Sequence, residues 1–169
     1  MAVKEILSLG NPKLYDISAP VEPDELPFIK TVVQDLHDTM LAFREKYRAG
    51  RAIAAPQLGV MKRVIYMHID APVVLLNPVY EFKSDEMFEL WDDCMCFPEM
   101  LVKVRRHRYI TLSYYDLDWK KQTASFSDDL SELLQHEYDH LDGMLAVSRA
   151  IDGRSFALRS EVELPARIG

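Results

Sequence analysis

Apolar residues recur at three- and four-residue steps along residues 25–48. This is the spacing of an α-helix, and it places on one face Ile29, Val32, Val33, Leu36, Met40, Phe43 and Tyr47. The pattern therefore predicts an amphipathic helix that lays an apolar stripe against a core. His37 lies beside the stripe, and we interpret it as an ordinary helix histidine rather than a ligand.

The middle of the chain alternates apolar and polar residues and is rich in β-branched and aromatic side chains. We expect strands at residues 63–69, 73–82, 87–91, 101–104, 109–115 and 121–126. A turn at residues 116–120 predicts that the last two strands form a hairpin. Because the strands follow one another without helices between them, they favour antiparallel sheets over a doubly wound parallel sheet.

A second helical pattern begins near Asp128 and ends at Gly143, and its apolar face consists of Leu130, Leu133, Leu134 and Leu141. Asp129 and Glu132 resemble a capping box at its start. We therefore expect an α+β fold in which antiparallel sheets pack around this helix, with a second long helix near the N terminus. One domain is expected over residues 1–169, wrapped by residues 4–23 and least constrained over residues 148–169.

Composition and charge narrow the classes of function. The chain of 169 residues is 49% hydrophobic and has a net charge of −7, which argues against nucleic-acid and anionic-membrane surfaces. It has no apolar run of the roughly 20 residues that span a bilayer. No signal or transit sequence is visible, and two cysteines close in sequence fit a reducing compartment, so we expect a cytoplasmic protein. The basic residues 103–108 are interpreted as a solvated strand edge.

The second helix carries the motif His-Glu-x-x-His at residues 136–140. Four residues advance an α-helix by about 400°, so His136 and His140 lie on one face, where two imidazoles can bind one metal ion. Glu137 follows the first histidine, from where its carboxylate can reach water at that ion. The motif predicts a catalytic metal site.

Such a site needs a third protein ligand and one open position. Cys94 ends a predicted strand, and its thiolate would be a strong ligand for Zn²⁺ or Fe²⁺. Glu161 and Glu163 lie downstream of His140, where some zinc proteases have a glutamate ligand, but Pro165 follows them closely. We favour Cys94 and leave the two glutamates as an alternative.

Small residues dominate residues 50–59, which read Gly-Arg-Ala-Ile-Ala-Ala-Pro-Gln-Leu-Gly. Small side chains allow a ligand or another element to approach the backbone closely. The glycine spacing is not that of a phosphate loop. Gln57 is the polar group that this loop would present to a ligand.

Three blocks in this order resemble the peptide deformylase family, whose patterns are Gly-x-Gly-x-Ala-Ala-Pro-Gln, Glu-Gly-Cys-Leu-Ser and Gln-His-Glu-x-Asp-His-Leu. The third block is matched fully at residues 135–141. The first is matched at residues 50–57, except that Ala52 replaces the second glycine. The middle block, residues 92–96, keeps Cys94 but changes its neighbours. The chain thus resembles a divergent member of this family.

The resemblance implies a metal-dependent hydrolase that removes the N-formyl group from the N-terminal methionine of nascent polypeptides, free or at the ribosome, and releases formate. It implies that the metal ligands are Cys94, His136 and His140. Fe²⁺ would be the native ion, with Zn²⁺, Ni²⁺ or Co²⁺ as substitutes. Glu137 would act as general base, and the Gln57 amide and the Met95 backbone N–H would stabilise the oxyanion.

By the same resemblance, the substrate-binding residues are Gly50, Arg51, Ala52, Ile53, Glu132 and Leu133, and the residues supporting the ligands are Asp92, Cys96 and Asp139. The family usually has aliphatic residues at the positions of Arg51 and Glu132, where they line a pocket for the methionine side chain. We hypothesise that these two charges alter or narrow the pocket, by pairing or by meeting a polar substrate side chain. Asp93 adds a further charge beside Cys94.

Two other classes of protein stay open at this point. One is a metallohydrolase of the same fold that acts on another formyl or small acyl amide, or as a peptidase through Glu161 or Glu163. The other is a non-catalytic metal-binding protein in which Cys96 closes the fourth position. Whether the protein is a monomer or a homodimer is left open by the sequence.

Overall fold

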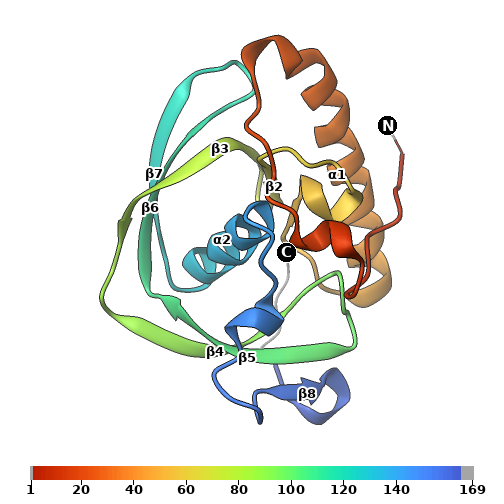
Figure 1. Cartoon of the computed structure of the whole chain (residues 1–169), viewed down its shortest axis with the longest axis vertical. Coiled ribbons are helices and arrows are strands. Elements are labelled where there is room, and N and C mark those ends of the chain that lie inside the picture. Colours follow the sequence, from red (N-terminus) through yellow and green to blue (C-terminus); the bar gives the residue numbers. More distant parts are fainter. Residues whose placement is uncertain (1, 165–169) are drawn as a thin grey trace.

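Two antiparallel β-sheets and two long helices form the fold in the computed structural model, which describes residues 2–164 (Figure 1). The larger sheet has the strand order β1-β2-β3-β6-β7, with bounds Ala52–Ala54, Val64–His68, Pro72–Lys83, Tyr109–Tyr115 and Lys121–Ser127. The smaller sheet has the order β4-β5-β8, with bounds Met87–Asp93, Met100–His107 and Phe156–Leu158. The α+β class and the antiparallel pairing expected from the sequence are confirmed.

The two helices occupy different places in the molecule. Helix α2 (Asp128–Leu141) lies in the middle of the view, above β4 and β5 (Figure 1). Strands β6 and β7 lie to its left, and α1 (Leu26–Tyr47) lies to its right. The apolar stripe of α1 packs against residues of β1 and β2. The leucines of α2 pack against the larger sheet. Polar side chains are buried along α2 as well, so this helix holds them in fixed positions.

The strand β3 runs through Asn77-Pro78 instead of ending there. Its register against β6 shifts between Leu76 and Val79, and Asn77 has a positive φ of 51°. The Asn77 side chain compensates, because its Oδ1 accepts a hydrogen bond from Val21 N at 2.8 Å and its Nδ2 donates to Val21 O at 2.9 Å. The irregularity therefore anchors the N-terminal segment.

The N-terminal segment wraps the fold, as the sequence predicts. Leu7 N donates to the Gln57 carbonyl at 2.8 Å, and Leu9 N donates to the Cys96 carbonyl at 3.0 Å. These two bonds hold segments that are far apart in the sequence and that both contribute to the predicted site.

Two local expectations were wrong. Glu132 does not form a capping box with Asp129, since Ser127 precedes the helix and Glu132 lies buried against Arg51. Residues 50–59 are not a plain loop, because β1 pairs with β2 at the edge of the larger sheet. The C-terminal segment, expected to be the least constrained, contributes β8 to the smaller sheet beside β5, and residues 165–169 of it lie outside the described residues. Each of these outcomes depends on a partner distant in the sequence.

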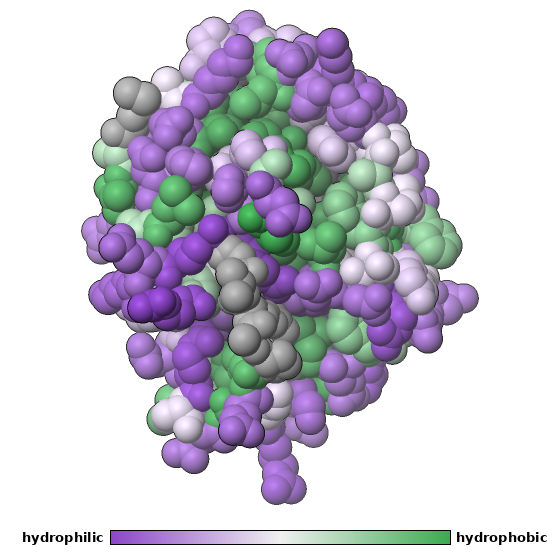
Figure 2. Space-filling view, turned by 180° about the vertical axis from the view of Figure 1, so that it is seen from behind, coloured by the Kyte–Doolittle hydropathy of each residue, from purple (hydrophilic) through white to green (hydrophobic). Residues whose placement is uncertain are grey.

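The surface seen from behind is mixed in character (Figure 2). Hydrophilic side chains occupy much of its periphery, and hydrophobic ones gather nearer its middle. Within residues 2–164, no helix combines the length and the hydropathy that a membrane crossing requires.

Candidate metal centre

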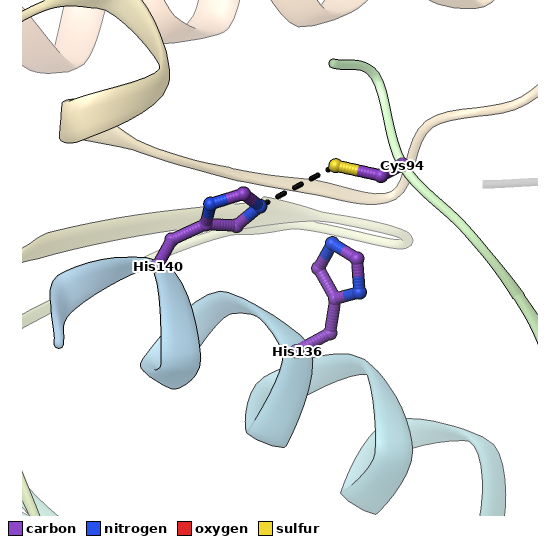
Figure 3. Close-up of side chains that lie close together, drawn as sticks. All are labelled: Cys94, His136 and His140. Atoms are coloured by element: carbon purple, nitrogen blue, oxygen red, sulfur yellow. Dashed lines mark hydrogen bonds between the residues drawn. The ribbon is translucent and has the colours of Figure 1, made fainter. Parts of the chain in front are cut away.

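Three buried side chains from two distant segments converge at the side of α2 that faces β4. His136 and His140 project from α2, and Cys94 directly follows β4 (Figure 3). One potential ligand atom from each residue lies within 4.8 Å of the others. Cys94 Sγ and His140 Nε2 are 3.4 Å apart. A tetrahedral ion with usual Zn–S and Zn–N bond lengths would separate these atoms by about 3.6 Å, so the donors fit a shared divalent cation.

The orientation of His136 is fixed by Asp92. The Asp92 Oδ2 atom lies 2.9 Å from His136 Nδ1, which leaves Nε2 of the ring for an ion. Burial alone would lower the pKa of His136, but the Asp92 carboxylate raises it to about 10. A carboxylate behind a ligand histidine is the usual way in which metal sites set the ring tautomer.

Asp92 belongs to a buried charge network that the sequence did not reveal. Arg106 donates from Nη2 to Asp92 at 3.1 Å and from Nη1 to Asp139 at 2.6 Å. Asp139 in turn accepts two bonds from Arg149, at 2.8 and 2.9 Å. Asp139, which was expected to support the ligands, therefore contacts Arg106, and Arg106 in turn contacts Asp92.

The interpretation of residues 103–108 as a solvated strand edge was wrong for Arg106, which is buried. Val102, Val104 and Arg106 alternate along β5 and face the same side of the sheet. The period-two pattern could have identified Arg106 as an inward-facing residue. Arg105, on the opposite face, is exposed and pairs with Glu89.

Burial also sets the pKa values of the other two candidate ligands. Burial lowers the pKa of His140 to about 3, which keeps the imidazole neutral and able to bind a cation. Burial also raises the pKa of the Cys94 thiol. A divalent cation would reverse that effect, because it stabilises the thiolate. His140 is thus ready to bind a cation, and a bound cation would in turn stabilise the Cys94 thiolate.

Glu137 lies beside the ligands and is also buried. Its Oε2 atom is among the buried polar atoms that have no hydrogen-bond partner within the described chain. Burial raises the pKa of Glu137 to about 7. A carboxyl group with this pKa can both accept and return a proton near neutral pH.

Gln57 presents its amide nitrogen to the same place. It lies in the 3₁₀ turn Ala55–Leu58, and its Oε1 accepts a hydrogen bond from Ala54 N at 2.8 Å. That bond turns Nε2 toward Cys96 Sγ at 3.6 Å and Cys94 Sγ at 3.9 Å. The small-residue segment therefore delivers a donor to the ligand set, as expected for Gln57.

A cavity of about 40 Å³ opens beside the candidate ligands. Among the residues that line it are the expected Gly50, Arg51, Ala52, Met95, Glu132 and Leu133. Ile53 is not in that lining, because its side chain is fully buried in the core beneath α1. Phe43, Asp93 and Arg159 line the cavity without having been expected, and Arg159 donates to Asp93 at 3.2 Å.

Arg51 and Glu132 are paired across the cavity wall. Arg51 Nη2 lies 2.8 Å from Glu132 Oε1, and both side chains are buried. Arg51 Nη1 also lies 3.4 Å from Asp129, which is exposed. The sequence left open whether the two charges pair with each other or meet a polar substrate side chain, and in the structure they pair with each other.

The alternative ligands are not in the cluster. Within residues 2–164, the group of side chains able to hold an ion consists of Cys94, His136 and His140. Glu161 and Glu163 are exposed. Cys96 lies against the Gln57 amide, and its backbone N–H points to Cys94 Sγ at 3.4 Å. Three protein donors would leave the fourth position of a tetrahedral cation for water or substrate, which is the usual arrangement of a catalytic metal site.

The comparisons with known proteins agree with this class. The sequence model of the polypeptide deformylase family matches residues 3–155. The peptide deformylase of Pseudothermotoga lettingae is 34% identical over 160 residues, which cover 95% of this chain and 90% of that protein. Peptide deformylase 1 of Bordetella pertussis is 34% identical over 174 residues, covering 96% of each chain.

Solved structures show the same relationship. The peptide deformylase of Thermotoga maritima superposes with a TM-score of 0.82 at 27% identity, covering 90% of this chain and all of that one (100%). A class I type b peptide deformylase from Acinetobacter baumannii gives a TM-score of 0.81 at 31% identity, covering 88% and 100%. The chain belongs to the peptide deformylase family, whose enzymes remove the N-formyl group from nascent peptides.

Proposed function

We propose that this protein is a metal-dependent hydrolase that removes the N-formyl group from the amino terminus of nascent polypeptides, formyl-methionine peptides among them. The observation that carries the proposal is the meeting of Cys94, His136 and His140 beside Glu137 and Gln57. Family membership supports the same reaction. The products would be formate and a free amino terminus.

We propose that Cys94, His136 and His140 hold Fe²⁺, for which Zn²⁺, Ni²⁺ or Co²⁺ can substitute. A thiolate with two imidazoles suits Fe²⁺ and Zn²⁺ alike, so the family's usual ion decides between them. When bound, the ion supplies Lewis acidity at the formyl oxygen and lowers the pKa of water. Asp92 would keep the His136 ring in its ligand orientation, and Arg106 would keep Asp92 charged.

The proposed roles of the remaining residues follow from where their polar atoms lie. Glu137 accepts the proton of the attacking water and later transfers it to the leaving amine. The Gln57 Nε2 atom, fixed by the bond from Ala54 N to Oε1, donates to the oxyanion that develops on the formyl oxygen. The Met95 backbone N–H is assigned the second donation. The bond that breaks is the C–N bond of the formamide.

We further propose that residues 1–169 act as one catalytic domain in the cytoplasm, as a monomer or a homodimer. The substrate would be a free peptide or a nascent chain at the ribosome. The proposed chemistry uses only residues of the buried site and requires neither the ribosome nor a membrane.

The test is release of formate from N-formylated tripeptides by protein purified anaerobically with Fe²⁺. We expect formate from the intact protein and a rate at least 100-fold lower from the Glu137→Ala variant, since general-base catalysis typically contributes about 10²–10⁴. Asp93→Asn is the matched control, because Asp93 is an acidic residue in the same cavity lining but pairs with Arg159. Absence of formate with every formylated peptide would refute the proposal.

A further inference from the structure

The cavity beside the candidate metal centre has a charged wall. Arg51 and Glu132 form a 2.8 Å ion pair there, and their side chains are only 8% and 2% exposed. The same cavity is lined by His136 and Glu137. If a formyl peptide binds with its formyl group beside His136 and Glu137, the side chain of its first residue would therefore contact this ion pair.

The pair is held by rigid elements. Arg51 immediately precedes β1, and its carbonyl accepts a hydrogen bond from His68 N at 2.9 Å. Glu132 lies on α2 one turn before His136. Separating the two charges would leave each one buried and poorly solvated, which is strongly unfavourable. The ion pair is thus a fixed part of the cavity rather than a mobile surface contact.

The pair restricts what can enter. The cavity of about 40 Å³ has room for about three water molecules. A thioether or branched aliphatic side chain would displace water from Arg51 and Glu132 and return no hydrogen bonds. Because Arg51 and Glu132 neutralise each other, a charged side chain that enters the cavity would lose its hydration without gaining a full counter-charge. A short neutral group that both donates and accepts can satisfy both charges.

We propose that this cavity selects N-formylated substrates whose first residue has a short, neutral, hydrogen-bonding side chain over substrates that begin with methionine or leucine. The inference depends on the proposed deformylation and specifies its substrate class. Arg51 and Glu132 are then the residues that determine specificity, through contact with the substrate side chain.

The first experiment compares isosteric substrates on the wild-type enzyme. Formyl-Asn-Ala-Ser and formyl-Leu-Ala-Ser differ in polarity but hardly in shape, and formyl-Gln-Ala-Ser and formyl-Met-Ala-Ser form a longer pair. Hydrogen bonds to charged groups discriminate by about 10- to 100-fold, so kcat/KM for the Asn peptide should exceed that for the Leu peptide by that factor. The longer pair separates polarity from size: Gln should exceed Met, and both should be slower than Asn.

The second experiment replaces the ion pair by apolar residues of similar volume, in the double variant Arg51→Met/Glu132→Leu. Such replacements of a buried pair are often tolerated, because no unpaired charge is left behind. The preference between the Asn and Leu peptides should reverse. The matched control is Arg105→Met/Glu89→Leu, which removes an exposed ion pair of 2.9 Å between β4 and β5 and should retain the wild-type preference.

The outcomes separate the inference from the proposed function. A wild-type enzyme that prefers the apolar member of either pair, or treats the members equally, overturns the inference and leaves deformylation intact. A polar preference that persists in the Arg51→Met/Glu132→Leu variant also overturns it, because the ion pair then does not cause the selection. If no peptide releases formate, the proposed function fails and the inference fails with it. The wild-type comparison needs no variant to fold.

Discussion

At the scale of single residues, burial sets the chemistry of the site. Glu137 and Asp92 are both carboxyl groups beside His136, yet their surroundings differ. Burial raises the pKa of Glu137 to about 7. Burial would also raise the pKa of Asp92, but His136 and Arg106 hold it below its usual range. One carboxyl group is thereby suited to proton transfer, and the other remains charged beside His136.

The pKa of Glu137 predicts the pH dependence of activity. The base must be ionised, so kcat/KM should be low at acid pH and should increase as the pH rises through about 7. A bound cation favours the carboxylate, which places the acid limb at or below that value in the loaded enzyme. Formate release measured between pH 5 and pH 9 would reveal the limb. An acid limb above about pH 7, where neither burial nor a bound cation would place it, would contradict the role of Glu137.

The two adjacent aspartates predict different effects on metal binding. Asp92→Asn removes the charge behind His136 and should weaken metal affinity by about 10- to 100-fold. Asp93→Asn should change it by less than about threefold, since Asp93 pairs with Arg159. Competition with a chelator measures both affinities. Equal losses in the two variants would show that local charge alone matters.

At the scale of elements, the alternation along β5 decides which arginine is structural. Arg106 points inward and joins Asp92 to Asp139, whereas Arg105 points outward to Glu89. A buried ion network stabilises a fold only when every charge is paired. The helix α2 and the strand β5 are therefore joined by charges as well as by apolar packing.

Removal of one member of that network should be costly. Arg106→Met leaves Asp92 and Asp139 buried without the cation between them, and it should lower the free energy of unfolding by about 3–5 kcal/mol. Arg105→Met, one residue away, should lower it by less than about 1 kcal/mol because its ion pair is exposed. Urea denaturation of the two variants measures the difference, and a similar small loss in both would argue against a structural role for Arg106.

The same network implies a direction for acid stability. Burial would raise the pKa of Asp139, but Arg149 and Arg106 hold it below its ordinary value of 3.8. A carboxyl group with a lowered pKa in the folded state contributes stability above its unfolded pKa, and that contribution is lost as pH falls through the folded value. The network should therefore stabilise the fold at neutral pH and lose this contribution below about pH 4.

At the scale of the whole molecule, the N-terminal segment connects the parts of the site. Its residues Leu7 and Leu9 donate backbone hydrogen bonds to the carbonyls of Gln57 and Cys96. The segment thereby bridges the turn that carries the Gln57 amide and the segment that carries Cys94 and Cys96. The site is completed by contacts that no single element contains.

Truncation of the chain separates this role from general stability. Deletion of residues 2–9 removes both bonds and should lower kcat/KM by about 10- to 100-fold, because small displacements of positioned groups are costly. Deletion of residues 2–5 keeps Leu7 and Leu9 and removes the hydrogen bonds of Ala2 and Lys4 to α1. This control should retain activity within about threefold. Formate release by folded samples is the measurement, and equal losses in both deletions would exclude the bridging role.

Much of the fold was predictable because its signals are local. The stripe of α1 follows from apolar residues a turn apart, and the β6–β7 hairpin follows from two alternating runs around a short turn. The histidine pair follows from a four-residue spacing on one helix. Strand limits were less accurate, since β5 continues through the charged residues to His107. Arginine is usually exposed, and the burial of Arg106 depends on its partners Asp92 and Asp139, which lie on other elements.

The sequence by itself determined the α+β class, the helix that carries His136 and His140, and the resemblance that led to Cys94 and Gln57. Only the tertiary structure decided how these segments meet and that an ion pair of Arg51 and Glu132 lines the cavity. Arg51 and Glu132 are 81 positions apart, and Arg106 and Asp139 are 33 apart. Periodicity records which face of an element is apolar, but it contains no information on which charge lies opposite another. That choice is made by packing, where burial makes an unpaired charge too costly to leave.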